Sequence, residues 1–429
     1  MKKVSTLIIA IICLIAAVAA CFGAYKYYNA KDPSPGSNQT EKPSTPPKEY
    51  KDTDYNVKLI KTVNSTQDGN YLISPYSIEI ALNMLKAGAK EDTYKQIDDV
   101  VGTRDIPVFS VKDRISVTNG AFIKDSYKDD VKKDYYDKLA SFDAEIIFDK
   151  FATPEKINNW VKEHTYGMIP KILDSMSKDF VLGIANAVAI DVEWDSQFEC
   201  QNTNKAEFVK TDGKKMNVQM MHAKYERGDT KYFETDDAKG VILPYMSYDK
   251  DGVDEYRSKE NEFTQLEFVG ILPNENVDKY IEGLTSDKLS KFDEKVTTTA
   301  EADIVLSLPR FAYSFDLENF MEVLQAMGIK DVFDPDKSNL SGIMDMPLYV
   351  STAIHKTYID LNEKGTKAAA ITYFGMDKAS SVPPQRDKKI IEFNKPFVYM
   401  IRDSKTKEIL FFGVVETPNE WKGETCEEE

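Results

Sequence analysis

Between Asp52 and Thr417 the sequence carries helical and strand-like patterns without internal repeats and without a linker that would divide it. Helical patterns come early: residues 77–87 have apolar side chains at helical spacing after a Ser-Pro start, with Gly88 as a stop signal, and residues 158–164 indicate another helix closing near Gly167. Strand-like runs come mostly late, at residues 184–190, 241–243, 268–272, 304–308, 357–361, 397–401 and 409–415. Helices followed by strands favour an α+β fold with large antiparallel or mixed sheets.

Composition allows a large core and argues against one class of partner. Of the 429 residues 42% are hydrophobic, and the formal net charge is −16. A charge of this sign repels nucleic acid and anionic membrane surfaces. We therefore expect no nucleic-acid partner, and contact with a membrane only through the N-terminus.

The N-terminus has the pattern of an export signal. Lys2 and Lys3 precede an apolar run over residues 7–20, and the segment Val-Ala-Ala-Cys that ends at Cys21 resembles a bacterial lipobox. We expect a signal peptide over residues 1–20, cleavage before Cys21 and lipidation of its thiol. The alternative is an uncleaved anchor, since about 17 apolar residues can span a bilayer. Both alternatives predict an exported, membrane-tethered protein, and the lipoprotein pattern indicates a bacterial cell surface.

A flexible tether follows this signal. Residues 29–48 are rich in Pro, Ser, Thr, Asn and Lys without any apolar period, so they cannot bury enough surface to offset the entropy of ordering. We therefore assign residues 21–48 to the lipidated cysteine and tether, 49–420 to a folded domain, and 421–429 to an acidic disordered tail.

Of the four cysteines, Cys13 lies in the signal and Cys21 is the predicted lipid site, which leaves Cys200 and Cys426. A disulfide between these two is one alternative, but their spacing matches no disulfide framework, so two unpaired thiols are the default expectation.

Motifs of the common enzyme classes do not occur. The three histidines have no Cys or carboxylate at metal-ligand spacing, and the sequence has no Gly-x-Ser-x-Gly elbow, Walker loop or Gly-x-Gly-x-x-Gly turn. The sequence therefore predicts a protein that is not an enzyme and needs neither a metal nor a cofactor.

An ordered set of short matches over about residues 52–418 resembles the serpin family. The matching segments are NYLISPYS at 70–77, NNWV at 158–161, LPRF at 308–311, FNKPF at 393–397 and ILFFG at 409–413, with further single matches between them. The resemblance implies a serpin fold of three β-sheets and about eight or nine helices, with an exposed reactive-centre loop.

The resemblance also assigns a proximal hinge to the loop. Its members are Glu363, Lys364, Gly365, Thr366, Lys367, Ala368, Ala369 and Ala370. In serpins this segment inserts into the main sheet as a new strand after the loop is cleaved. As a strand, one face would carry residues 366, 368, 370, 372, 374 and 376, none of them charged, and the other face carries Lys367 as its single charge. Composition alone would favour an Ala-rich helical turn that runs into a strand, but the surrounding matches to serpins favour the hinge.

The bond that a protease would cleave is assigned in the same way. Counting from Glu363 as in serpins generally gives Ala379–Ser380, whereas counting back from Val382 gives Ser380–Ser381. A small residue before the bond favours an elastase-like protease. Cleavage between Lys378 and Ala379 would suit a trypsin-like enzyme.

Five further residues match control positions of serpins. Ser74, Ser77, Asn186 and His355 match the shutter, a polar cluster under the sheet that rearranges when strands part, and Trp194 is expected to cap the breach, where insertion begins.

The resulting prediction is a tethered, monomeric, inhibitory-type serpin that traps an elastase-like serine protease as a covalent acyl complex. The alternatives are an inhibitor of a trypsin-like or cysteine protease, and a non-inhibitory binding or structural protein with the serpin fold. A hydrolase is a third class, but it lacks a nucleophile motif.

Overall fold

The computed structural model describes residues 46–107, 109–366 and 386–420. All of them belong to one compact unit, Glu41–Glu429, whereas the other unit, Met1–Thr40, lies outside the described residues. The predicted signal peptide, Cys21, most of the tether and the acidic tail therefore lie outside them as well. In the described ranges, no helix has both the length and the apolar character needed to cross a membrane.

Eight α-helices occur in the described residues, and five of them lie before residue 165. They are α2 (Tyr55–Asn64), α3 (Pro75–Gly88), α4 (Glu91–Val101), α5 (Lys133–Ser141), α6 (Glu155–His164), α7 (Val277–Glu282), α8 (Ser286–Ser290) and α9 (Phe320–Met327). Short 3-10 turns are η1 (Asp125–Tyr127), η2 (Cys200–Asn202), η3 (Lys291–Lys295) and η4 (Asp331–Phe333).

Both helices predicted from the sequence are confirmed, and their ends have local causes. Ser74 caps α3 by accepting a hydrogen bond from the Ser77 amide at 3.1 Å, and proline occupies the first turn, where its missing N–H costs nothing. Helix α6 ends at His164, and the chain reverses at Gly167, whose φ of +77° lies in the left-handed region that glycine adopts without strain.

Strands fill much of the remaining chain. Those before residue 250 are β1 (Tyr71–Ile73), β2 (Ile115–Lys124), β3 (Ala144–Asp149), β4 (Leu182–Ile190), β5 (Val192–Glu193), β6 (Thr203–Val209), β7 (Lys215–Tyr225), β8 (Lys231–Glu234) and β9 (Ala238–Pro244). Those after it are β10 (Leu266–Pro273), β11 (Val296–Thr298), β12 (Asp303–Pro309), β13 (Phe311–Asp316), β14 (Lys356–Leu361), β15 (Gly365–Thr366), β16 (Lys388–Glu392), β17 (Phe397–Asp403) and β18 (Ile409–Val415). Each of the seven runs predicted from the sequence lies within one of these strands.

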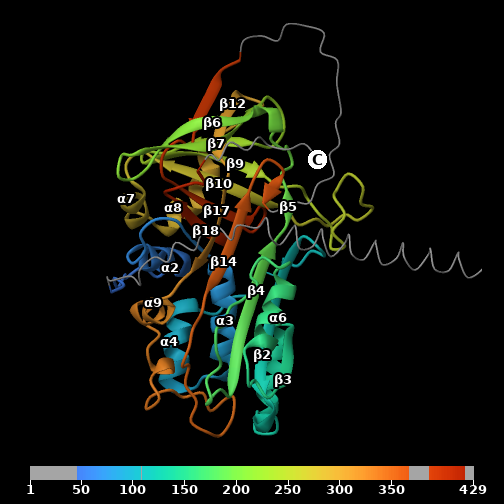
Figure 1. Ribbon diagram of the computed structural model, residues 1–429, viewed down its shortest axis with the longest axis vertical. Helices are drawn as coiled ribbons and strands as arrows, with labels where there is room; N and C mark the ends of the chain where they lie inside the picture. Colours follow the sequence, from blue (N-terminus) through green and yellow to red (C-terminus); the bar gives the residue numbers. More distant parts are fainter. Residues whose placement is uncertain (1–45, 108, 367–385, 421–429) are drawn as a thin grey trace, which may run out of the picture. The chain divides into compact units, whose positions relative to one another are not determined.

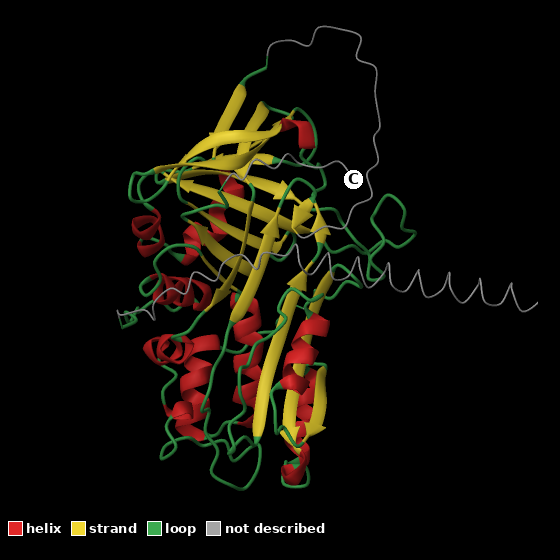
Figure 2. Cartoon of the chain, viewed as in Figure 1, coloured by secondary structure: helices red, strands yellow, loops and turns green. Residues whose placement is uncertain are grey.

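The largest sheet has the order β1-β18-β17-β10-β9-β8-β11 and forms the centre of the core. Every residue of β10, β17 and β18 is buried, which means that both faces of these strands are covered. Strands covered on both faces have continuous apolar runs, and such runs are what made them recognisable in the sequence. Figure 2 shows the helices and strands of the described chain.

The described strands form four sheets, where the sequence predicts three. The other sheets have the orders β16-β12-β7-β6, β13-β14-β15-β5 and β3-β2-β4. Only Asp191 separates β4 from β5, yet β4 pairs with β2 whereas β5 pairs with β15. In the described residues no backbone pairing joins β4 to its neighbour β14, so one potential sheet is divided into two (Figure 1).

Candidate functional site

The site is built around β15, the described end of the predicted hinge, which lies between two strands of one sheet. Leu361 of β14 is opposite Thr366, and Val192 of β5 is opposite Thr366 on the other side. The Thr366 side chain is only 3% exposed, and its hydroxyl lies 2.7 Å from that of Tyr245. Gly365 and Thr366 of the predicted hinge are therefore already part of a sheet, and Thr366 lies on its buried side.

Gly365 allows the close approach of β15 to β5. A Cβ at this position would lie 2.1 Å from the Val192 carbonyl oxygen and 2.7 Å from the Glu193 Cα. Any side chain would have to push two backbone segments apart, so only glycine allows this pairing.

Glu363 anchors the chain just before β15. Its carboxylate is 5% exposed, accepts a hydrogen bond from the Thr203 hydroxyl at 2.7 Å, and lies 3.5 Å from Arg310 Nε. Its carbonyl oxygen accepts a hydrogen bond from the Phe198 amide at 2.9 Å. A buried carboxylate is tolerated only with such partners, so these contacts fix where the loop leaves the fold.

Trp194, the predicted breach residue, lies directly beneath this turn. Its indole Nε1 donates to the Asn362 carbonyl at 2.9 Å, and its amide donates to the Lys364 carbonyl at 2.9 Å. The ring stacks on Tyr245 at 4.4 Å between centroids and is 1% exposed. Sequence reasoning missed Tyr245, which contacts both Trp194 and Thr366, because nothing around Pro244 marks it as special.

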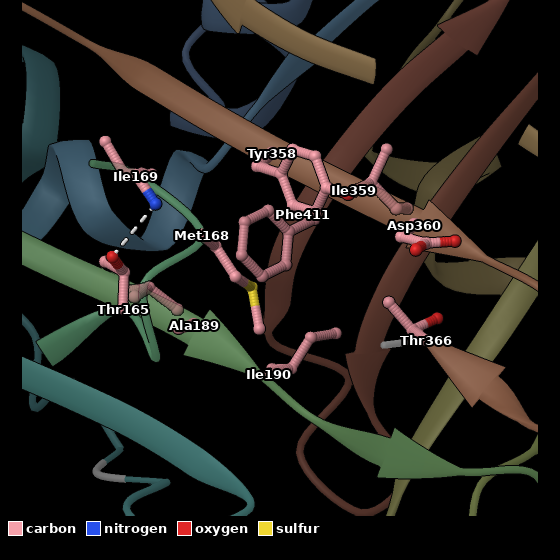
Figure 3. A pocket seen from close by; sticks show the side chains of 11 residues that line it. Thr165, Met168, Ile169, Ala189, Ile190, Tyr358, Ile359, Asp360, Thr366 and Phe411 are labelled. Carbon is pink, nitrogen blue, oxygen red and sulfur yellow. Dashed lines mark hydrogen bonds between the residues drawn. The ribbon is translucent and has the colours of Figure 1, made fainter. Parts of the chain in front are cut away.

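Beyond β15, the space between β4 and β14 is filled by a segment that follows α6. Residues 165–169, with side chains of β4, β14 and β18, leave a cavity of only about 10 Å³, roughly the space of one water. Figure 3 shows the Met168 side chain reaching into this space beside Phe411. A new strand could enter between β4 and β14 only if the 165–169 segment moves away.

Side chains of α6 and β3 hold α6 and the chain that follows it in place. Asn158 accepts from the amides of Ile172 and Leu173, both at 2.9 Å. Glu145 of β3 accepts from Trp160 Nε1 at 2.7 Å and lies 3.1 Å from His164 Nε2. Asn158 and Trp160 belong to the segment that resembles the serpin motif, whereas the role of Glu145 was not predicted.

The four predicted shutter residues form a continuous polar chain. The Ser74 amide donates to His355 Nε2 at 3.0 Å, the Ser77 amide donates to Ser74 Oγ at 3.1 Å, and the Ser77 hydroxyl lies 3.5 Å from the Asn186 carbonyl. Asn186 Nδ2 donates to Asn119 Oδ1 at 2.7 Å. Burial of the imidazole lowers the pKa of His355 to about 4, so the ring is neutral at pH 7 and can accept from Ser74.

Several predicted site residues lie outside the described residues. These are Cys21, the hinge residues Lys367, Ala368, Ala369 and Ala370, and the bait positions Lys378, Ala379, Ser380 and Ser381. The expectation of two unpaired thiols is wrong for Cys200, which is disulfide-bonded. The other three cysteines, including Cys426 of the alternative pairing with Cys200, lie outside the described residues.

This geometry can be set beside that of known proteins. The family model described as Serpin (serine protease inhibitor) matches residues 51–418. An uncharacterized serpin-like protein of Methanosarcina mazei is 29% identical over 381 residues, covering 83% of this chain and 83% of its own length. The leukocyte elastase inhibitor of Xenopus tropicalis is 27% identical over 400 residues, covering 85% and 98%. The native-state structure of the thermophilic serpin tengpin has a TM-score of 0.70 and 30% identity, covering 85% and 92%.

In this fold, the residues at the start of the loop pair with strands of a divided sheet, and the family model matches residues 51–418. Together these observations define the class of protein. The chain belongs to the serpin family. Serpins are mostly protease inhibitors rather than catalytic enzymes, and their partners are in general proteases.

Proposed function

We propose that this chain is a suicide-substrate inhibitor of a serine protease, which it traps by inserting its cleaved loop between β4 and β14. One observation carries the proposal: Gly365 and Thr366 pair with β5, and Thr366 pairs also with β14, so a third strand has already begun. The next strand residues would extend an existing ladder rather than nucleate a new one.

The register of β15 gives the expected position of each inserted residue. Residues two apart share a face, so Ala368 would lie opposite Ile359 and Ala370 opposite Thr357. Ile359 and Thr357 are buried, and the small uncharged side chains of the hinge suit such surroundings. Continued by two more residues, the same register brings Thr372 opposite His355, where the polar chain beneath the sheet would have to rearrange.

The covalent step belongs to the protease. Its serine oxygen attacks the carbonyl carbon of Ala379, the peptide bond to Ser380 breaks, and the protease histidine delivers the serine proton to the departing amine. An ester then joins the protease to Ala379. Insertion of the loop before water hydrolyses that ester would leave the protease trapped, so the outcome depends on a competition of rates.

The target is proposed from the loop sequence and from one relative. Ala379 and Ser380 would fit a narrow specificity pocket, and one relative is named a leukocyte elastase inhibitor. An elastase-like enzyme is therefore our first candidate, with a trypsin-like enzyme acting after Lys378 as the second. We further propose that the chain works on a bacterial cell surface, exported by residues 1–20 and tethered through lipidated Cys21.

The test is a trapping assay on the full chain, kept soluble with mild detergent. Mixed with a neutrophil-type elastase, and separately with trypsin, it should give a band near the sum of both masses on a denaturing gel. Mass spectrometry of the released peptide should find Ser380 or Ser381 at its N-terminus after elastase, or Ala379 after trypsin. A nicked chain beside fully active protease, for both enzymes, would instead support the non-inhibitory alternative.

Two neighbouring substitutions provide a matched control for insertion. By the register above, the side chain at position 370 would face the core and the one at 369 would face solvent. Ala370→Asp should abolish the covalent complex while the loop is still cut, because insertion would bury an unpaired charge. Ala369→Asp should preserve trapping. Equal behaviour of the two variants would contradict the register.

A further inference from the structure

A hollow of about 320 Å³ lies beside the strand that follows the loop, away from the site described above. Its apolar part consists of Leu272 and Pro273 at the end of β10 and Ile390 of β16, whose side chain is 54% exposed. Its polar part includes Lys239 of β9 and Lys395, which lies between β16 and β17. We call it the lysine hollow. Its volume falls within the range of small-ligand sites.

The two lysines of the hollow are notable because their charges are not neutralised by a salt bridge to a described residue. Neither forms an ion pair with a described carboxylate, although Glu392 also lines the hollow. Lys395 Nζ donates to the carbonyl oxygens of Pro273 at 2.7 Å and Asn274 at 3.4 Å, which holds its ammonium group in place. Burial and the neighbouring Lys239 charge lower the pKa of Lys395, so these cations are close enough to repel each other.

An anion between the two lysines would relieve this repulsion. The nearby Glu392 carboxylate favours a ligand with a single negative charge over a more highly charged one. The exposed Ile390 beside Leu272 provides a surface on which an apolar body would be removed from water. Charge and volume together define a small amphiphile rather than a free inorganic ion.

We propose that the lysine hollow binds a small organic monoanion, with a carboxylate head between Lys239 and Lys395 and a short apolar body against Ile390 and Leu272. A ligand seated there would join β16 to β9 and β10. It would therefore stabilise the strand on which the loop ends, whether or not the chain traps a protease.

The test uses hexanoate as the probe and the full chain in mild detergent. Saturation-transfer NMR and thermal unfolding would measure hexanoate binding. Acetate is one control, because it has the carboxylate without the apolar chain. Hexan-1-ol is the other control, because it has the apolar chain without the charge. We expect saturable hexanoate binding with a millimolar dissociation constant and a rise in Tm, and much weaker effects from both controls. If hexan-1-ol bound as tightly as hexanoate, the proposal would be wrong.

Two lysine variants separate a specific site from general attraction of anions. Lys239→Gln removes a cation that has no hydrogen bond or ion pair to a described residue, so the fold should be preserved. Lys388→Gln removes an exposed cation from the same strand as Ile390, outside the hollow. We expect about fivefold to tenfold weaker hexanoate binding for the first variant and no change for the second. Equal affinities of the two variants would overturn the proposal.

Discussion

His355 should make the folded state sensitive to acid. Its buried ring accepts a hydrogen bond from the Ser74 amide, and no carboxylate among the described residues pairs with it to stabilise a proton. Burial lowers its pKa from 6.5 to about 4 in the folded protein. A group whose folded pKa is depressed in this way binds protons more readily when unfolded. Its contribution to stability is therefore complete above pH 6.5 and is lost as the pH falls toward 4.

The magnitude follows from the difference between the two pKa values. With 1.36 kcal/mol for each pKa unit, the free energy of unfolding should fall by about 2 kcal/mol between pH 7 and pH 5, and by about 3 kcal/mol at pH 4. Protonation would also turn the imidazole nitrogen that accepts from Ser74 into a donor. The Ser74 amide would then be buried without its acceptor.

Urea unfolding of the wild type and of a His355→Gln variant measures this effect. Other groups titrate over the same range, but they do so in both proteins, so the difference between the two unfolding free energies isolates His355. The variant should be less stable at pH 7 by about 1–3 kcal/mol, and this gap should shrink by about 2 kcal/mol at pH 5. A gap that stays constant from pH 7 to pH 5 would show that the ring does not titrate as a buried neutral group.

Three further outcomes are expected. Thr366→Arg should displace β15 from the sheet, because a charge beside buried Tyr245 costs several kcal/mol. This variant should be cleaved as a substrate without trapping the protease, whereas Thr366→Val should still trap it. The yield of covalent complex on a denaturing gel compares the two variants. Glu145→Gln should weaken the charge-assisted hydrogen bond with Trp160 by about 1–2 kcal/mol. Amide hydrogen exchange should therefore become faster in α6 and stay unchanged in β10. Equal protection of α6 in the wild type and the variant would contradict this. Cys200 should resist alkylation until a reductant is added, and mass mapping that finds it modified without reductant would contradict the disulfide.

Much of the fold could be predicted from the sequence because its elements have local causes. The run at residues 409–415 is apolar at nearly every position, and in β18 all of these residues are buried. Helix α3 begins where a serine cap and a proline stand together, and both act within one turn. The predicted shutter residues were found by resemblance, and the structure brings all four into one hydrogen-bonded chain.

The division of the sheet could not be predicted in the same way. Residues 184–190 have the same strand pattern whether they pair on one side or on two. The pattern therefore does not reveal that, in the described part of the chain, β4 has no strand paired to it on the side toward β14. The lysine hollow likewise depends on side chains that meet from distant segments, namely β9, the end of β10, β16 and the chain before β17.

By itself, the sequence determined which segments are helices and strands, the serpin family, and a predicted hinge in which alternate residues from Thr366 onward carry no charge. These properties depend on neighbouring residues or on a fixed order of short motifs. The tertiary structure decided that Thr366 meets Tyr245, 121 residues earlier in the chain, and that His355 meets Ser74 across 281 residues. Such contacts arise only when the chain has folded, because local conformational preference does not specify which distant side chain lies opposite.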